Sequence, residues 1–217
     1  MLASGDVDGL VTGLTRSFSV CFEQIARVID PKPGRRTFGL SVLAMPGRTV
    51  FIADSTVNPR PSAELFVEIA IHSAKHARAL GHEPRVALLS FSNFGQPPSE
   101  ITRSIRDAVK LLDQRAVDFE YDGEMTVEMA LDGELRQRLY PFCRMTGSAN
   151  VLVMPGLHAA DIGSKLLQKL GSGGMIGPLL VGLSKPVQIV QLGATVNDLV
   201  TAACLAVHAD LQNERGL

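Results

Sequence analysis

The chain has 217 residues, of which 46% are hydrophobic and 20% charged, the proportions of a globular protein with a buried core. Its 21 Lys and Arg residues against 22 Asp and Glu residues give a formal net charge of -1. Because this balance comes without a basic tract, it excludes a general attraction to nucleic acid. No run of about 18 apolar residues occurs, so we expect no segment to span a membrane. The first residues also lack the pattern of a signal peptide.

Three widely spaced cysteines form no CxxC pair, which favours reduced thiols in a cytoplasmic protein over a disulfide framework. Cys21 and Cys204 stand in helical apolar patterns and are expected in the core, whereas Cys143 is expected near a loop. We expect none of the three to be catalytic, because a thiol nucleophile needs a histidine base beside it.

Apolar runs alternate with amphipathic stretches from the start of the chain. Residues 9–13 are expected to form a buried strand. A natural protein could start so abruptly, but we expect a piece excised from a longer polypeptide. The remaining pattern predicts strands and helices in alternation. In chain order, these are a helix over 17–29, strands over 37–44 and 49–53, a helix over 63–80, a strand over 85–91, a helix over 99–114, a strand over 117–121, a helix over 125–139, a strand over 149–154, a helix over 159–170, a strand over 175–183 and a helix over 195–213.

Turn and cap residues support these boundaries. Pro46-Gly47 predicts a turn that makes the strands on either side a hairpin, Ser62 is a good helix N-cap, and Asp132-Gly133 interrupts the helix over 125–139. Strands that alternate with helices of 10–20 residues predict an α/β fold whose mostly parallel sheet is flanked by helices on both faces. Ligands bind such sheets at the carboxyl ends of the strands.

Two motifs that attract attention have ordinary explanations. The glycines of residues 171–177 follow a helix and precede a strand, the reverse of a dinucleotide fingerprint, and no Gly-Lys-Ser/Thr follows as in a P-loop. A helix stop and turn explains them better. His72 and His76 have the i, i+4 spacing of metal ligands, but no third ligand stands near them in the sequence, so we expect no metal site.

Three further groups lie where a parallel sheet would bind a ligand. Asp122-Gly123-Glu124 is either a pair of carboxylates at a strand end or a tight turn before a helix. Asn150, Pro155, His158 and Lys165 surround the next connection from strand to helix. Thr195 and Asp198 resemble a capping box with Asp in place of Glu, so helix capping alone explains that carboxylate.

Ordered segments along nearly the whole chain resemble the phosphate acetyl/butyryl transferase family. They are Gly9-Leu10-Val11-Thr12-Gly13, Ala53-Asp54, Val57-Asn58-Pro59, Ser62-Ala63-Glu64, residues 83–90, Asp122-Gly123-Glu124, residues 149–153 with Pro155, Ile162-Gly163, Lys165, Ile176-Gly177-Pro178, Gly182-Leu183 and Lys185-Pro186-Val187. The resemblance implies an isocitrate/isopropylmalate dehydrogenase-like fold of two lobes, with acetyl-CoA in the cleft between them, and a homodimer or higher homo-oligomer. It also implies that residues 1–217 lack the first part of that fold.

A closer resemblance is to the version of this domain found at the C-terminus of bacterial NADP-dependent malic enzymes. It is carried by residues 117–125, by Tyr140-Pro141-Phe142-Cys143-Arg144 and by Pro186-Val187-Gln188-Ile189. This resemblance implies a partner malic-enzyme domain in the same polypeptide, which would oxidatively decarboxylate malate with NADP and a divalent metal. It implies no cofactor in the present chain, only acetyl-CoA as a regulatory ligand.

The chain departs from the family where active transferases carry Ser-Arg-Gly followed by an Asp. Here Gln191-Leu192-Gly193 stands in that place, with Asp198 retained, and Leu192 lacks the hydrogen bonds that a guanidinium gives to phosphate. Other departures are Glu23 for an arginine, which Arg16 one turn earlier would offset, Gly156 for an aspartate and Ser164 for a tyrosine.

We therefore expect a non-catalytic domain that regulates a malic enzyme by binding acetyl-CoA. The candidate binding residues are Arg16, Ser17, Asn150, His158, Lys165, Gly193 and Asp198. Two alternatives remain open at this stage. One is a working phosphate acetyltransferase, which converts acetyl-CoA and phosphate to acetyl phosphate and CoA. The other is a purely structural dimerisation module.

Overall fold

The computed structural model describes residues 1–171 and 173–214, with side chains described as far as residue 207. Ser172, in the glycine-rich stretch that we interpret as a turn, lies outside the described residues. The chain divides into two compact units. One comprises Met1–Gly39 and Ile176–Leu217, here called unit 1, and the other comprises Leu40–Met175, here called unit 2. Strand β7 (Gly174–Val181) begins with the last two residues of unit 2 and continues into unit 1.

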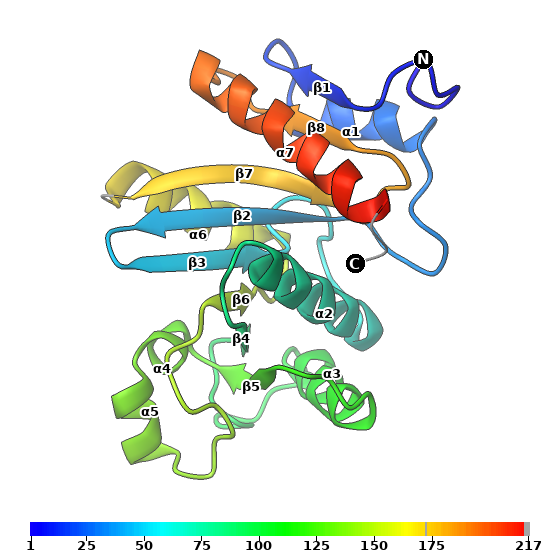
Figure 1. Cartoon of the computed structure of the whole chain (residues 1–217). Coiled ribbons are helices and arrows are strands. Elements are labelled where there is room, and N and C mark those ends of the chain that lie inside the picture. The colour runs from blue at the N-terminus through cyan, green and yellow to red at the C-terminus, as the bar shows by residue number, and fades with distance from the viewer. Residues whose placement is uncertain (172, 215–217) are drawn as a thin grey trace. The chain divides into compact units, whose positions relative to one another are not determined.

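Unit 2 is built on a mostly parallel sheet with the strand order β5-β4-β6-β3-β2 (Figure 1). Its strands are β2 (Phe38–Met45), β3 (Arg48–Ala53), β4 (Arg85–Leu89), β5 (Glu120–Met125) and β6 (Val151–Val153). Strands β2 and β3 form an antiparallel hairpin that turns at Gly47, whose φ of +72° suits glycine. The pairs β3-β6, β6-β4 and β4-β5 are parallel, as buried strands joined by helices require.

The described part of unit 2 contains five helices, and Figure 1 shows α2 in front of the sheet and α6 behind it. They are α2 (Ala63–Ala79), α3 (Arg103–Gln114), α4 (Val127–Leu131), α5 (Gly133–Leu139) and α6 (Leu157–Leu170). The Ser62 side chain caps α2 by accepting the N–H of Leu65. Asp132 both ends α4 and caps α5, because its carboxylate accepts the N–H of Leu135.

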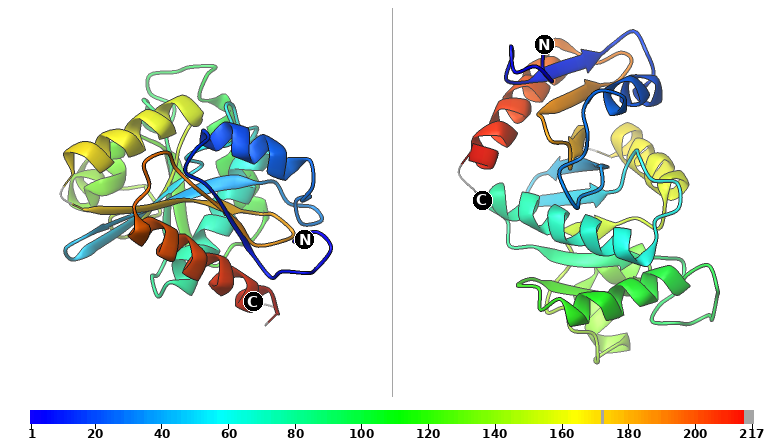
Figure 2. Two further views of the ribbon diagram at one scale, coloured as in Figure 1. Left: turned by 90° about the horizontal axis from the view of Figure 1, so that it is seen from above. Right: turned by 90° about the vertical axis from the view of Figure 1, so that its right-hand side faces the viewer.

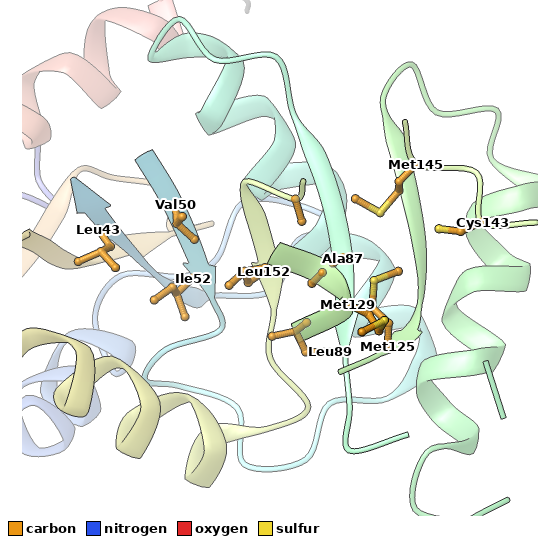
Figure 3. Packing of buried hydrophobic residues seen from close by; sticks show 12 residues of the cluster. Leu43, Val50, Ile52, Ala87, Leu89, Met125, Met129, Cys143, Met145 and Leu152 are labelled. Atoms are coloured by element: carbon orange, nitrogen blue, oxygen red, sulfur yellow. The ribbon is translucent and has the colours of Figure 1, made fainter. Parts of the chain in front are cut away.

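The core of unit 2 joins the sheet to α4 and to the loop that precedes β6 (Figure 3). Its labelled members are Leu43, Val50, Ile52, Ala87, Leu89, Met125, Met129, Cys143, Met145 and Leu152, all at most 8% exposed. Alternate residues of the central strands supply them, as expected for a pleated sheet. This apolar layer holds the carboxyl ends of β3, β4 and β6 in a fixed order, which positions the loops that follow them.

Unit 1 contains β1 (Leu10–Gly13), α1 (Phe18–Ala26), β8 (Val187–Val190) and α7 (Val196–Glu214). Strands β1 and β8 pair in parallel, with Leu10 opposite Val187 and Gly13 opposite Val190. Helices α1 and α7 contact both strands and lie on opposite faces of this small sheet (Figure 2). The first and last segments of the chain thus fold together.

The predicted fold class is confirmed, as are the hairpin and the break at Asp132. Strand β8 was not predicted, because it has only four residues and one of them, Gln188, is polar. The strand over 9–13 exists, but its burial was predicted wrongly: Leu10 is 37% exposed.

Two further predictions were wrong. The strand predicted over 117–121 is β5 at Glu120–Met125, so Asp122-Gly123-Glu124 lies within a strand and not in a turn before a helix. Pairing with β4 outweighs the low strand propensity of these residues. Cys204 is exposed, because Ala202 and Ala206 of α7 are the buried positions and Cys204 lies on a different side of the helix.

Candidate functional site

The carboxyl ends of β1 and β8 bring two loops together in unit 1. Gly13 is paired with Val190, and the N–H of Leu14 donates to the carbonyl oxygen of Val190 at 3.5 Å. The chain can pass so closely because Gly13 has φ +125° and no side chain; a Cβ atom there would overlap that oxygen. Residues 14–17 and 191–195 therefore start side by side, at the edge where parallel sheets bind ligands.

The loop after β1 supplies two of the predicted residues, Arg16 and Ser17, both exposed. Ser17 is the N-cap residue of α1 but makes no side-chain cap bond, and its hydroxyl lies 3.2 Å from that of Ser19. No acidic residue stands in the first turn of α1. The N–H groups at this helix end, together with a cationic side chain beside them, favour an anion.

Glu23, which stands where the family has an arginine, would repel an anionic ligand. Its charge is reduced by an ion-pair partner that the sequence analysis did not identify. Arg27 donates to the Glu23 carboxylate at 2.6 Å, an i, i+4 ion pair on the exposed side of α1. The spacing of the two residues was the available signal. Because the guanidinium of Arg27 balances the negative charge of Glu23, Arg16 is not needed to neutralise that charge.

The loop after β8 carries Gln191, Leu192 and Gly193. Leu192 is 60% exposed, so an apolar side chain is open to solvent in the loop that follows the carboxyl end of β8. Gly193 has φ +77°, which a residue with a side chain adopts only at a cost, and it turns the chain towards α7. The loop is therefore shaped by glycine geometry and offers no cationic side chain.

Asp198 and Thr195 form the capping box expected at the start of α7. The Thr195 N–H and hydroxyl both donate to the Asp198 carboxylate, at 2.7 and 2.8 Å, and the Asp198 N–H donates to the Thr195 hydroxyl oxygen at 3.2 Å. The bond from the Thr195 backbone N–H, followed by that from its hydroxyl, holds the pKa of the Asp198 carboxyl below its usual value. A carboxylate of lowered pKa is a weaker base.

In unit 2 the structure separates the predicted residues. Asn150 stands just before β6, at the amino end of the strand, where its amide accepts the N–H of Arg85 at 2.7 Å and donates to the Glu83 carbonyl at 2.8 Å. His158 and Lys165 follow the carboxyl end of β6 on α6, both exposed, and Lys165 pairs with Asp161. Asn150 thus links β4 and β6 at their amino ends, whereas His158 and Lys165 follow the carboxyl end of β6.

The carboxyl end of β3 holds a buried carboxylate whose role was not predicted. Asp54 is 2% exposed and accepts the backbone N–H groups of Thr56, Val57 and Asn58 at 2.7–3.1 Å. Its side chain organises the whole loop after β3 by satisfying these donors. The segment from Ala53 to Pro59 was part of the family resemblance, but nothing in the sequence pattern alone assigned Asp54 this task.

Glu124, at the carboxyl end of β5, is fully buried and paired. Both of its carboxylate oxygens lie 3.2 Å from Nη1 of Arg106, and the Ser92 hydroxyl donates to one of them. This cluster ties β5 to α3 and to the loop after β4. One of the two carboxylates in Asp122-Gly123-Glu124 is therefore a structural anchor, and the other, Asp122, accepts the N–H of Arg144.

The described residues offer neither a metal site nor a membrane-spanning helix. No three His, Cys, Asp or Glu side chains of the described part are grouped as a metal site requires. Within the same part, no helix has the length and apolarity needed to cross a membrane. A cavity of about 580 Å³ lies beside α5 in unit 2, between residues 131–137 and 146–148, and contains none of the predicted site residues.

Comparison with known proteins gives one family and two kinds of relative. The sequence model described as phosphate acetyl/butaryl transferase matches residues 1–207. The NADP-dependent malic enzyme of Rhizobium meliloti (strain 1021) is 51% identical over 96% of the chain, which spans only 27% of that protein. The phosphate acetyltransferase of Bacillus subtilis (strain 168) is 34% identical over 94% of the chain and 64% of its own length.

A solved structure supports the same relationship. A phosphotransacetylase from Streptococcus pyogenes superimposes with a TM-score of 0.86 at 30% identity, covering 95% of this chain and 65% of its own. The chain thus spans about a quarter of the malic enzyme that it matches and about two thirds of the transferases. The fold of unit 1 and unit 2 is that of the solved phosphotransacetylase.

Proposed function

Since the chain belongs to the phosphate acetyl/butaryl transferase family, we propose that it is a regulatory domain of an NADP-dependent malic-enzyme polypeptide, which binds acetyl-CoA but transfers no acetyl group. The higher identity to malic enzymes than to phosphate acetyltransferases supports the malic-enzyme assignment. In this proposal NADP and a divalent metal belong to another domain of that cytoplasmic polypeptide, and the present domain also contributes to a homodimer or higher oligomer.

The observation that carries the binding proposal is the edge formed by the carboxyl ends of β1 and β8. CoA is an anion, and Arg16, the Ser17 hydroxyl and the uncapped start of α1 offer it a cation, a donor and a favourable dipole. Gly193 keeps the opposite loop free of a side chain at its turn. Lys165 and His158, exposed on α6, are further candidates.

The loss of transfer is proposed from Leu192 and Asp198. Where the family resemblance implies an arginine that holds phosphate or CoA oxygens, Leu192 exposes an apolar side chain. Losing an electrostatic contact to the reacting group costs on the order of a hundredfold or more in rate. The carboxylate of the retained Asp198 accepts hydrogen bonds from Thr195 and has a lowered pKa. Asp198 is therefore a poor base for deprotonating the thiol of CoA.

Calorimetry with acetyl-CoA tests the binding proposal. We expect Arg16→Ala to weaken binding by about tenfold or more, because a charge-assisted contact is lost. Arg103→Ala is the control, since Arg103 is an exposed arginine of unit 2 that pairs with Glu100 and is not a candidate binding residue, and we expect a change of less than about threefold. Equal effects of the two substitutions would contradict the assignment of Arg16.

The catalytic and regulatory parts need separate assays. Acetyl phosphate and CoA should give no acetyl-CoA with this chain, and turnover that Asp198→Asn abolishes would instead establish a working transferase. For regulation, acetyl-CoA should change the malate oxidation rate of the malic-enzyme polypeptide that contains the domain, because an effector must bind two states with different affinity. Kinetics indifferent to acetyl-CoA, in an oligomer that persists without ligand, would support a purely structural domain.

A further inference from the structure

Two exposed leucines stand in the turns that follow the carboxyl ends of β1 and β8. Leu14, directly after β1, is 40% exposed, and Leu192, two residues after β8, is 60% exposed. The N–H of Leu14 donates to the carbonyl oxygen of Val190, so the two turns start from neighbouring strands. Turns normally carry glycine or short polar residues. Two large apolar side chains in adjacent turns are therefore unusual.

The backbone holds Leu14 in an unfavourable conformation. Its φ is +68°, and the N–H of Thr15 donates to the carbonyl oxygen of Gly13 at 2.9 Å. A three-residue turn with this hydrogen bond and a positive φ at its centre is the rare, strained form of the γ-turn. A glycine would adopt it freely, whereas a leucine does so at a cost. Strain of this kind is concentrated at sites where the side chain has a function.

Leu192 is likewise presented by a defined turn. The N–H of Ala194 donates to the carbonyl oxygen of Gln191 at 3.1 Å, and Gly193 has a φ of +77°. A glycine of positive φ at the third position makes this a type II β-turn, in which Leu192 occupies the second position, at the corner. The exposure of the leucine thus follows from the turn that carries it.

The charges around the two turns are few. Residues 10–17 and 187–197 contain one ionisable side chain, that of Arg16. Asp198, the next residue, has its carboxylate hydrogen-bonded to Thr195. One cation together with uncharged apolar turns complements a ligand that is anionic in one part and apolar in another. An acyl-CoA has both parts, whereas inorganic phosphate has no apolar part and free CoA ends in a thiol.

We propose that the turns of Leu14 and Leu192 contact the acyl group of an acyl-CoA, so that the domain selects CoA thioesters whose acyl group is aliphatic and uncharged. This inference rests on the proposed function, because it takes the edge of β1 and β8 as the place where CoA binds. It adds the species that is recognised: acylated CoA in preference to free CoA, dicarboxylic acyl-CoA or phosphate. Regulation would then follow the acylated fraction of CoA and not its total concentration.

Two pairs of ligands test the proposal by calorimetry, with the chain and with the malic-enzyme polypeptide that contains it. Burying one methyl group is worth about fourfold in affinity, so acetyl-CoA should bind about fourfold or more tightly than CoA. Malonyl-CoA has a carboxylate where propionyl-CoA has a methyl group, and an unpaired carboxylate against leucines is costly. We expect malonyl-CoA to bind about tenfold more weakly than propionyl-CoA. Millimolar phosphate should not compete with acetyl-CoA.

Variants of the two leucines make the result specific. Leu192→Ala, and Leu14→Gly, which suits the positive φ, should each reduce the preference for acetyl-CoA over CoA to about twofold or less. Leu192→Arg should reverse the preference between propionyl-CoA and malonyl-CoA and make phosphate a competitor, because a guanidinium binds these anions. Leu139→Ala, at a 53% exposed leucine of unit 2, is the matched control and should leave every ratio unchanged.

The possible failures can be told apart. If no CoA species binds, the proposed function and this inference are both wrong. Equal affinities within each pair would overturn the acyl inference and leave the proposal of CoA binding intact. A preference for acyl-CoA that persists in Leu14→Gly and in Leu192→Ala would overturn the assignment of these leucines, because the acyl group would then be bound elsewhere.

Discussion

Replacing Glu124 with Gln is the sharpest test of how unit 2 is held together. The substitution keeps the volume of the side chain but removes the negative charge that faces Arg106 and Ser92. Breaking a fully buried ion pair costs roughly 3–5 kcal/mol. The Arg106 side chain is 30% exposed and reaches solvent, so its charge is only partly stranded. We therefore expect Glu124→Gln to lower the free energy of unfolding by about 2–3 kcal/mol.

The chain offers a reporter that is confined to this unit. It has no Trp and two Tyr residues, Tyr121 and Tyr140, both in unit 2. Urea titrations followed by tyrosine fluorescence therefore monitor unit 2 without interference from unit 1, and linear extrapolation gives the free energy of unfolding. Adding Arg106→Gln completes a double-mutant cycle, in which we expect a coupling energy of about 1 kcal/mol or more.

A matched control is the ion pair between Glu100 and Arg103, whose atoms are closer, at 2.7 Å, but whose side chains are 77% and 64% exposed. Glu100→Gln should cost no more than about 1 kcal/mol, because exposed pairs are screened. If Glu124→Gln cost no more than Glu100→Gln, burial would not be what gives the Glu124 cluster its strength, and the reasoning would be refuted.

Three more predictions concern other parts of the chain. Gly13→Ala should abolish the hydrogen-exchange protection of β1 and β8, because the added Cβ overlaps the partner strand. Ultraviolet titration of Tyr121 should give a pKa of about 12, raised first by burial and then by its bond to Asp113, so its contribution to stability is complete below pH 10 and is lost as the pH rises through 12. Thr195→Ala should cost about 1 kcal/mol and fray the start of α7, measured by amide exchange.

Each of these predictions has its own control. Gly5 also has positive φ, but nothing lies within 4 Å of a Cβ placed there, so Gly5→Ala should leave β1 protected. Asp113→Asn should lower the pKa of Tyr121 but leave it above 10, because burial is the larger cause. Thr195→Ala should raise the pKa of Asp198 only part of the way towards its usual value, because the backbone N–H of residue 195, the larger cause, remains; an unchanged pKa would mean that the hydroxyl bond is absent in solution.

The sequence was sufficient for the elements that local chemistry determines. Ser62 and Asp132 begin helices because their oxygens accept the backbone N–H group three residues later, and Thr195 accepts that of Asp198 in the same way at α7. The hairpin around Pro46-Gly47 follows from turn preferences of the same local kind. Leu192 could be recognised as a departure only by comparison with the family that the sequence resembles.

What could not be read from the sequence depends on contacts between distant segments. The pairing of β1 with β8 joins residues almost 180 positions apart, and no local sequence pattern predicts this pairing. The burial of Glu124 depends on Arg106 from another element, and Asn150 lies at the amino end of its strand because it bridges Glu83 and Arg85. The sequence therefore proposed Arg16 and Gly193 as binding candidates, but it did not indicate that their loops follow two paired strands, β1 and β8.

Calorimetric titration of the chain with acetyl-CoA tests the central proposal most directly. We expect saturable one-to-one binding that Arg16→Ala weakens about tenfold and Arg103→Ala leaves nearly unchanged, in a protein that forms no acetyl-CoA from acetyl phosphate and CoA. Absence of binding, both to the chain and to the malic-enzyme polypeptide that contains it, would contradict the proposal that this transferase fold has kept its ligand after losing its reaction.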